Sequence, residues 1–227
     1  MTAVATAESD RLGGGARIML RAHWRSGRRA LLAWVITLIA LFAATVESMN
    51  SLYDTAEKIA DYAAGTRSGS ATLAINGEPY GVDNIGGVIA YELGFMTAIA
   101  LPLMGILLVA KWTRREEESG RLEMIRAGAV ARRAPLAAAL VWAVLALAVT
   151  AVGLTVSMGA IGIAWSDALL YAVSTVSLGV WFGAVTALAA QIVERTRAVY
   201  AVGLAVLTAA FVLRGAGAVG DNVLTWL

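Results

Sequence analysis

The sequence contains no cysteine and a single histidine in 227 residues. The absence of cysteine excludes disulfides, thiolate metal sites and a cysteine nucleophile. The one histidine, His23, has no second histidine and no acid nearby, so we interpret it as an interfacial polar residue rather than a metal ligand or general base. Charged residues make up only 15% of the chain, well below the roughly 25% of soluble domains.

Motifs that carry chemistry are also missing. The run Gly13, Gly14 and Gly15 is not followed by Lys-Ser or Lys-Thr and is therefore not a phosphate loop, and neither HExxH nor GxSxG occurs. The net charge is +2, and no cluster interleaves basic with aromatic residues, so nucleic acid is not expected as a partner. We expect no catalytic, metal-binding or cofactor-binding residues in this chain, and no enzymatic activity.

The sequence is rich in apolar residues, which make up 59% of the chain. Several uncharged runs are long enough to cross a bilayer, including thirty-two positions at 135–166, which are too many for one span. The sequence predicts an all-α, polytopic membrane helical bundle. Its five spans are expected at about 30–46, 88–110, 135–157, 168–192 and 198–213.

The segments outside the spans differ in character. Residues 1–29 are expected to begin as a disordered leader and to continue, over 17–29, as an Arg-rich helix in the headgroup layer. The loop 47–87 has apolar residues at helical spacing over 49–63, which predicts an outer amphipathic helix, followed by loop with a short strand at 71–75. Arg214 is expected to open an outer connection after the fifth span.

Three features inside the spans stand out. Glu92 lies about one turn inside the second span, where a carboxylate either reaches headgroups or lines a pathway. Pro102 sits in the middle of that span and predicts a kink, which makes it a candidate gating residue. Gly179 and Gly183 form a GxxxG pair, which predicts close approach of another helix.

The longest strongly charged segment is residues 111–134, with seven basic and four acidic residues. Thr113 and Glu116 have the spacing of a capping box, and helical pairing is available between Glu117 and Arg121 and between Arg114 and Glu118. Gly120 is a candidate break in this helix. The segment is either a solvated connector that fixes topology or a helix that docks a cytoplasmic partner.

The distribution of basic residues predicts the orientation. Segments 1–29, 111–134 and 191–197 carry fifteen Lys and Arg, whereas the opposite side carries Lys58, Arg67 and Arg214. The positive-inside rule therefore predicts a cytoplasmic N-terminus.

The second span, with TLAINGEPYGVDNIGGVIAYELGF before it and TRREEESGRLEMIRAGAVARR after it, resembles the first half of the permease subunits of bacterial ABC exporters of the antibiotic, polyketide or multidrug efflux type. The resemblance implies a location in the bacterial inner membrane and a coupling helix that contacts separate ATP-binding subunits, which hold the ATP and Mg. It assigns this contact to Arg115, Glu116, Glu117, Glu118, Gly120, Arg121 and Glu123.

Such permeases resemble two six-span halves, whereas only five spans are predicted here. The resemblance therefore implies either a piece of a longer permease or a half that needs a separate or identical second chain. Two alternatives remain open. One is a non-transporting membrane scaffold or regulatory subunit that recruits a partner through the charged segment. The other is an intramembrane enzyme using Glu92, although a single acid without a partner residue makes a poor catalytic site.

Overall fold

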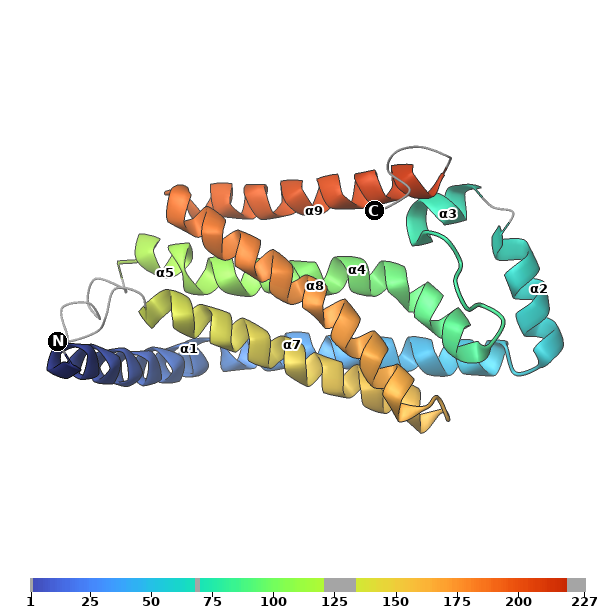
Figure 1. The fold of residues 1–227 in the computed structure, drawn as a ribbon, viewed down its shortest axis with the longest axis horizontal. Helices are drawn as coiled ribbons and strands as arrows, with labels where there is room; N and C mark the ends of the chain where they lie inside the picture. Colours follow the sequence, from blue (N-terminus) through green and yellow to red (C-terminus); the bar gives the residue numbers. More distant parts are fainter. Residues whose placement is uncertain (1, 68–69, 121–133, 220–227) are drawn as a thin grey trace. The chain divides into compact units, whose positions relative to one another are not determined.

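We describe a computed structural model of the chain, covering residues 2–67, 70–120 and 134–219. Helices account for nearly all of these residues, and no strand occurs among them. The helices are α1 (Thr2–Leu52), α2 (Ala56–Arg67), α3 (Ser70–Asn76), α4 (Ile85–Trp112), α5 (Arg114–Glu118), α7 (Ala134–Ala160), α8 (Trp165–Ile192) and α9 (Thr196–Ala218) (Figure 1).

Among the described residues, five helical segments are long and apolar enough to cross a membrane, which confirms the predicted all-α, polytopic fold class. They are Gly27–Leu52, Ile85–Glu118, Ala134–Ala160, Trp165–Ile192 and Thr196–Ala218. In lipid, every backbone N–H and C=O must find its partner within the protein, and a continuous helix achieves this within one segment. The polar groups that still need partners are therefore concentrated at the helix ends.

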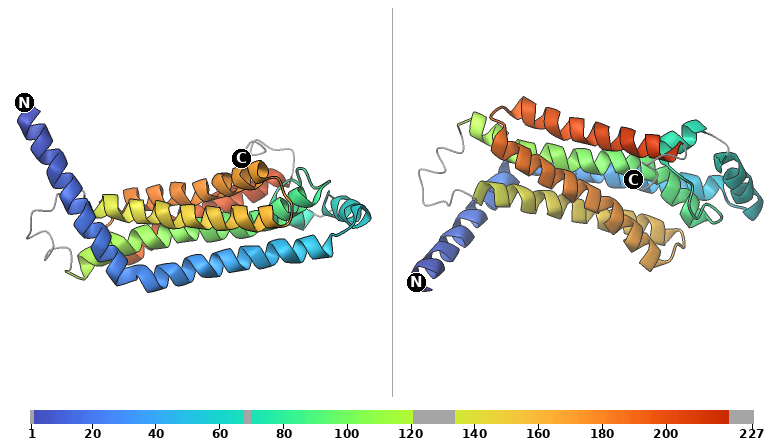
Figure 2. Two further views of the ribbon diagram at one scale, coloured as in Figure 1. Left: turned by 90° about the horizontal axis from the view of Figure 1, so that it is seen from below. Right: turned by 45° about the horizontal axis from the view of Figure 1, so that its top comes forward.

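The chain divides into two compact units. Unit 1 comprises Met1–Val35, Pro102–Ala148 and Gly179–Leu204, and unit 2 comprises Ile36–Leu101, Val149–Leu178 and Ala205–Leu227. In unit 1 the second half of α4 lies beside α8 and α9 (Figures 1 and 2). Pro102 is buried within α4, which continues through it as one helix.

Glycine permits the close approach of α4 and α8 in unit 1. A Cβ atom built on Gly105 would lie 2.1 Å from the backbone oxygen of Gly179. On the other helix, a Cβ on Gly183 would come closest to Val109, at an ordinary 3.5 Å. The close approach that the GxxxG pair predicts is confirmed, and its partner is Gly105, which the pattern did not single out.

The N-terminal leader differs from its prediction, because residues 2–29 are helical and continuous with the first span. Each glycine in a helix costs about 1 kcal/mol relative to alanine. The leader is otherwise rich in Ala and Arg, and it extends an existing helix, so it avoids the unfavourable nucleation step. Figure 2 shows that α1 changes direction ahead of its membrane-spanning part.

The loop 47–87, in unit 2, corrects two further predictions. The expected helix over 49–63 is interrupted at residues 53–55, where the Thr55 hydroxyl accepts the Lys58 N–H at 3.3 Å and so caps α2. The expected strand at 71–75 is helix α3, which ends at Asn76 and is followed by Gly77 with φ +85°. Local propensity at 71–75 favours neither helix nor strand strongly, so tertiary contacts decide which of the two forms.

Arg214 supplies one of those contacts. It lies inside α9 rather than opening a connection, and its guanidinium donates to the Ile75 oxygen at 3.2 Å and to the Asn76 oxygen. These carbonyls are among the last of α3, which have no partner within their own helix. The Arg214 side chain therefore links α9 to the end of α3.

The contact at Gly105 gives a first prediction. We expect Gly105→Ala to lower the apparent melting temperature of the purified chain in mild detergent by several degrees, because overpacking at a backbone contact costs about 1–3 kcal/mol. Gly183→Ala, in the same contact but with room for a Cβ, is the matched control and is expected to be close to neutral. Equal losses in the two variants would contradict the packing described here.

Candidate functional site: the charged turn after α4

The charged turn comprises residues 113–120, which follow α4 in unit 1. The predicted capping box at its start is wrong: the Thr113 hydroxyl donates to the Val109 oxygen at 2.7 Å and makes no side-chain cap with α5. A hydroxyl near the end of a helix often bonds back to the carbonyl four residues earlier. Gly120 has φ +70° and follows the end of α5, as expected of a glycine that breaks a helix.

Arg114 joins the charged turn to the end of α8. Its Nε donates to the Ala190 oxygen at 2.6 Å, and its Nη1 donates to Glu117 Oε2 at 2.7 Å. The Ala190 carbonyl is one of the last four of α8, which lack a donor within their own helix. The arginine therefore places positive charge at the negative end of the helix dipole. The sequence predicted Glu118, not Glu117, as the partner of Arg114.

Glu118 joins the same turn to the start of α9. Its Oε1 accepts the Thr196 backbone N–H at 2.7 Å, and Thr196 is the first residue of α9. A carboxylate is favourable at this position because the first N–H groups of a helix are unpaired and the dipole is positive there. Arg114 and Glu118 are four residues apart on α5, so both reach the α8–α9 turn from one face.

Small apolar residues pack beneath these polar contacts. Ala110 of α4 belongs to a buried cluster with Ala189 and Ala190 of α8 and Val199 of α9. Small side chains allow the helix ends to come close enough for Arg114 and Glu118 to bridge them. The charged turn is thus fixed to α8 and α9 by both packing and hydrogen bonds.

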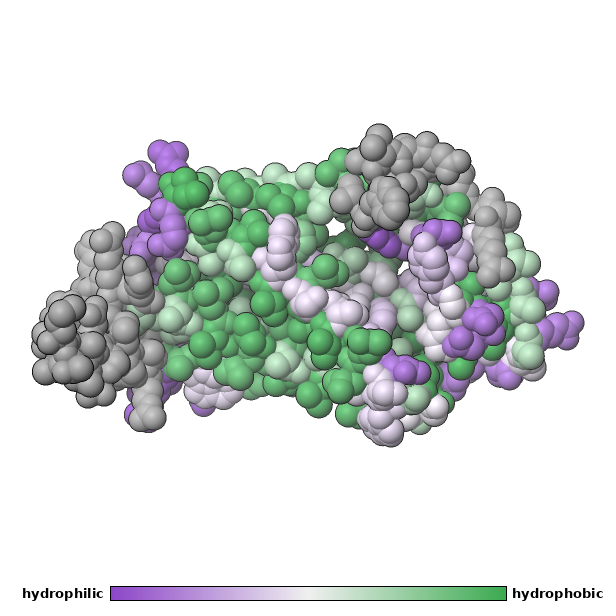
Figure 3. Space-filling model, viewed as in Figure 1, coloured by the Kyte–Doolittle hydropathy of each residue, from purple (hydrophilic) through white to green (hydrophobic). Residues whose placement is uncertain are grey.

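The remaining residues assigned to partner contact stand as follows. Arg115 and Glu118 are exposed, Glu116, Glu117 and Gly120 are half-buried, and Arg121 and Glu123 lie outside the described residues. Figure 3 shows hydrophilic side chains gathered at the end of unit 1 where α5 and the α8–α9 turn lie. Even with Glu118 and Glu117 bonded inside the chain, this turn still presents charge to the surroundings.

A stack of aromatic rings holds the N-terminal part of α1 in unit 1. The rings of His23 and Trp112 stack with centroids 5.4 Å apart, and those of Trp24 and Trp142 stack at 5.1 Å. Trp142 Nε1 also donates to the Leu20 oxygen at 3.0 Å. His23 is therefore a buried packing residue, only 3% exposed, rather than an interfacial one. No sequence pattern signals this stack, because its members are far apart in the chain.

The environment of His23 changes its acidity. Burial, and secondarily the positive charge of Lys111, lower the pKa of His23 to about 4. An imidazole with this pKa is neutral at physiological pH, which suits a ring stacked on an indole.

Glu92 lies in unit 2, where it accepts a hydrogen bond from the Tyr62 hydroxyl of α2. Tyr62 packs edge to face on Tyr53, with ring centroids 4.9 Å apart, and the nearby Tyr91 hydroxyl donates to the Gly77 oxygen at 3.0 Å. Burial and the Glu92 carboxylate both raise the pKa of Tyr62. Glu92 thus ties α2 to α4, and its role in a pathway stays a prediction.

Within the described residues, no group of three or more His, Cys, Asp or Glu side chains is placed to hold a metal ion. The charged turn is hydrogen-bonded to both α8 and α9, so a movement of the turn can be passed to these two helices.

These helices show that the chain is a multi-pass, all-α membrane protein. The chain is similar to the multidrug efflux system permease protein Rv1217c of Mycobacterium tuberculosis (strain ATCC 25618 / H37Rv), with 34% identity over 218 residues. The aligned region covers 92% of this chain and 38% of that protein, so the chain spans less than half of its relative. No protein-family model matches the chain. The resemblance to an efflux permease that the sequence predicted is confirmed.

The Glu118 contact can be tested by amide exchange. We expect Glu118→Ala to speed exchange at the first turn of α9 several-fold, because the Thr196 N–H loses its acceptor. Glu118→Gln, which keeps an acceptor oxygen, should have a smaller effect. Glu57→Ala, which removes an exposed acid in the first turn of α2, is the control and should leave α9 unchanged. Unchanged exchange in Glu118→Ala would show that the contact does not hold this helix end.

His23 gives a pH prediction, since it is the only histidine and its NMR signals need no assignment. We expect the labelled imidazole to stay neutral as the pH falls from 8 to 5. The folded-state pKa of about 4 lies below the unfolded value of 6.5, so the unfolded chain takes up the proton first and stability should fall as the pH drops below 6.5.

His23→Phe keeps a stacking ring without a titrating group, and it should remove this component of the pH dependence. A titration midpoint near 6.5 in the folded chain would refute the burial of His23.

Proposed function

We propose that this chain is a permease half of an ATP-driven bacterial exporter. The observation that carries the proposal is the similarity of nearly the whole chain to an efflux permease, together with a charged turn bonded to two neighbouring membrane helices. The expected cargo is a drug-like or antibiotic compound. The energy source is a separate ATP-binding-cassette subunit, which supplies the ATP and Mg sites.

In this proposal the charged turn receives a push from the ATP-binding subunit. Because Arg114 bonds to the end of α8 and Glu118 to the start of α9, a displacement of α5 moves both helix ends together. The close contact at Gly105 then couples the same movement to the body of α4. Packed helices shift as units because a densely packed interior resists gradual deformation.

The proposal assigns different tasks to the residues of the turn. Arg114, Glu117 and Glu118 are positioning residues, because their side chains are engaged inside unit 1. Arg115, which is exposed, is the described residue best placed to meet the ATP-binding subunit, with Glu116 beside it. Arg121 and Glu123 are proposed to contact the same subunit.

The proposal also places the chain in the bacterial inner membrane with its N-terminus in the cytoplasm. The fifteen basic residues predicted on the inner side support this orientation. A second permease half, either a separate or an identical chain, completes the pathway. A single carboxylate in the outer part of α4, Glu92, stays a candidate pathway residue, and Pro102 a candidate hinge.

The test is reconstitution with the partner. The chain should co-purify from bacterial membranes in mild detergent with an ATP-binding-cassette subunit, identified by mass spectrometry, and inverted vesicles should accumulate a fluorescent lipophilic dye only with MgATP. We expect Arg115→Glu to insert normally but to reduce both recovery of that subunit and dye uptake at least about tenfold, since it reverses an exposed interfacial charge.

Arg25→Glu, which changes a likewise exposed arginine on α1, is the matched control and should behave like the unchanged chain. Recovery of a different partner with no ATP-driven uptake would favour the scaffold interpretation instead. Full coupling in Arg115→Glu would remove the charged turn from the mechanism.

A further inference from the structure

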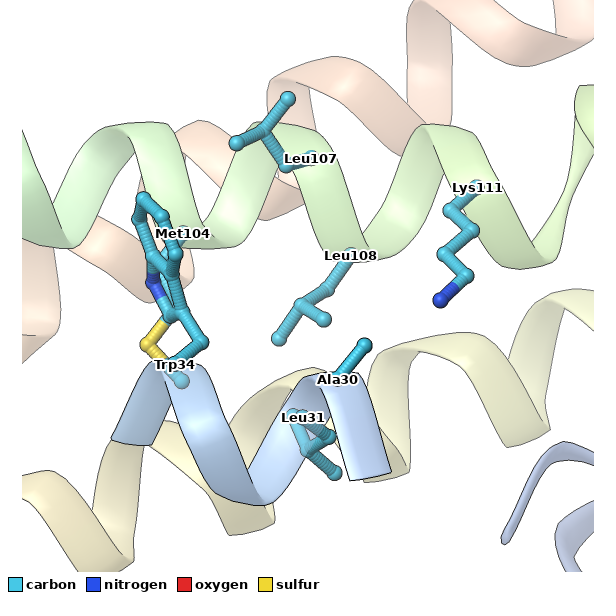
Figure 4. A pocket seen from close by; sticks show the side chains of 7 residues that line it. All are labelled: Ala30, Leu31, Trp34, Met104, Leu107, Leu108 and Lys111. Atoms are coloured by element: carbon cyan, nitrogen blue, oxygen red, sulfur yellow. The ribbon is translucent and has the colours of Figure 1, made fainter. Parts of the chain in front are cut away.

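A groove on unit 1 runs between α1 and α4 and has a volume of about 140 Å³. Trp34 and Met104 lie at one end, and Lys111 lies at the other, beside Ala30 (Figure 4). Leu31, Leu107 and Leu108 complete the lining. A cavity of roughly 150 Å³ is enough to bind benzene, so this groove is large enough for a segment of hydrocarbon chain.

The groove is accessible from outside the chain. Trp34 is 39% exposed and Leu107 is 40% exposed, and both belong to membrane-spanning segments. The surroundings of this opening are therefore hydrocarbon, and an acyl chain can enter without crossing a polar barrier.

The Lys111 end of the groove is positively charged. The lining includes no acid, and Lys111 takes part in no ion pair within the described residues, although its ammonium lies 5.8 Å from the centre of the Trp112 ring. Arg28 and Arg29 are exposed on α1 directly before Ala30. Basic residues at the end of a membrane span, beside an apolar cleft, match a lipid with a negative headgroup and an apolar tail.

We propose that this groove binds an anionic phospholipid, with one acyl chain along Trp34 and Leu107 and the headgroup phosphate on Lys111, assisted by Arg28 and Arg29. The occupant comes from the bilayer leaflet on the arginine-rich side. The proposal does not depend on transport or on an ATP-binding subunit, so it can fail or succeed separately from the function proposed above.

The experiment uses the full chain in phosphatidylcholine vesicles and measures quenching of Trp34 by brominated acyl chains. The Trp34 signal is obtained as the difference between the chain and its Trp34→Phe variant. We expect brominated phosphatidylglycerol to quench Trp34 at lower mole fraction than brominated phosphatidylcholine. Lys111→Gln should weaken this preference about fivefold, the effect of one basic residue near a charged lipid surface, and Lys111→Arg should retain it.

The chain offers a matched control, because it has only one other lysine. Lys58 lies on α2 in unit 2 and pairs with Asp54 at 2.7 Å, so Lys58→Gln should leave the preference unchanged. Ala30→Leu fills the groove without changing charge, and it should reduce quenching by both lipids. If Lys111→Gln does not fold, the comparison of the two brominated lipids on the unchanged chain still tests the headgroup, and Ala30→Leu tests the acyl chain.

Equal quenching by the two brominated lipids, or an equal loss in Lys58→Gln, would overturn the proposal. Quenching of Trp34 by an uncharged drug-like dye, with no preference for phosphatidylglycerol, would also overturn it and would assign the groove to a transported compound.

Discussion

Two oppositely charged side chains on one turn of helix, Arg114 and Glu118, hold together the end of unit 1 on which the proposed function depends. The arginine meets a carbonyl at the end of α8, and the glutamate meets an N–H at the start of α9. Each contact satisfies a backbone group that its own helix leaves unpaired, and each complements the dipole at that end. One short helix thereby fixes the place where the chain reverses direction between two membrane spans.

Such an arrangement follows from the composition of the chain. With so few charged residues, most polar partners for helix ends have to come from the short connections, where water or headgroups tolerate charge. In unit 2 a charged side chain again meets a helix end, here from within a span, since Arg214 of α9 reaches the last carbonyls of α3. Tyr62 and Glu92 provide a further link between a connection and a span. The apolar spans supply length and packing surface, whereas a small number of polar residues determine how the helix ends are held.

The sequence predicted the features that depend on local composition. Its predictions failed where the hydrogen-bonding or packing partner of a side chain depends on the three-dimensional structure. Hydropathy identifies the spans because transfer of apolar residues into lipid depends on local composition alone, and the GxxxG pair marked one side of the α4–α8 contact. The capping role of Thr113 was wrong because spacing cannot reveal that the hydroxyl bonds back to Val109. The strand at 71–75 was wrong because nothing near it in sequence signals that Arg214 ends a helix there. His23 was placed at the interface because its stacking partner, Trp112, is distant in the chain.

The end of α4 brings several of these contacts to one place. Lys111 borders the groove proposed for lipid, and Trp112 stacks on His23 of α1. Two residues further on, Arg114 donates to the Ala190 oxygen at the end of α8. A change in any one contact alters the position from which the others are made, because α5 follows α4 after a single residue. A lipid bound at Lys111 would therefore bias the same helix end that the charged turn is proposed to move.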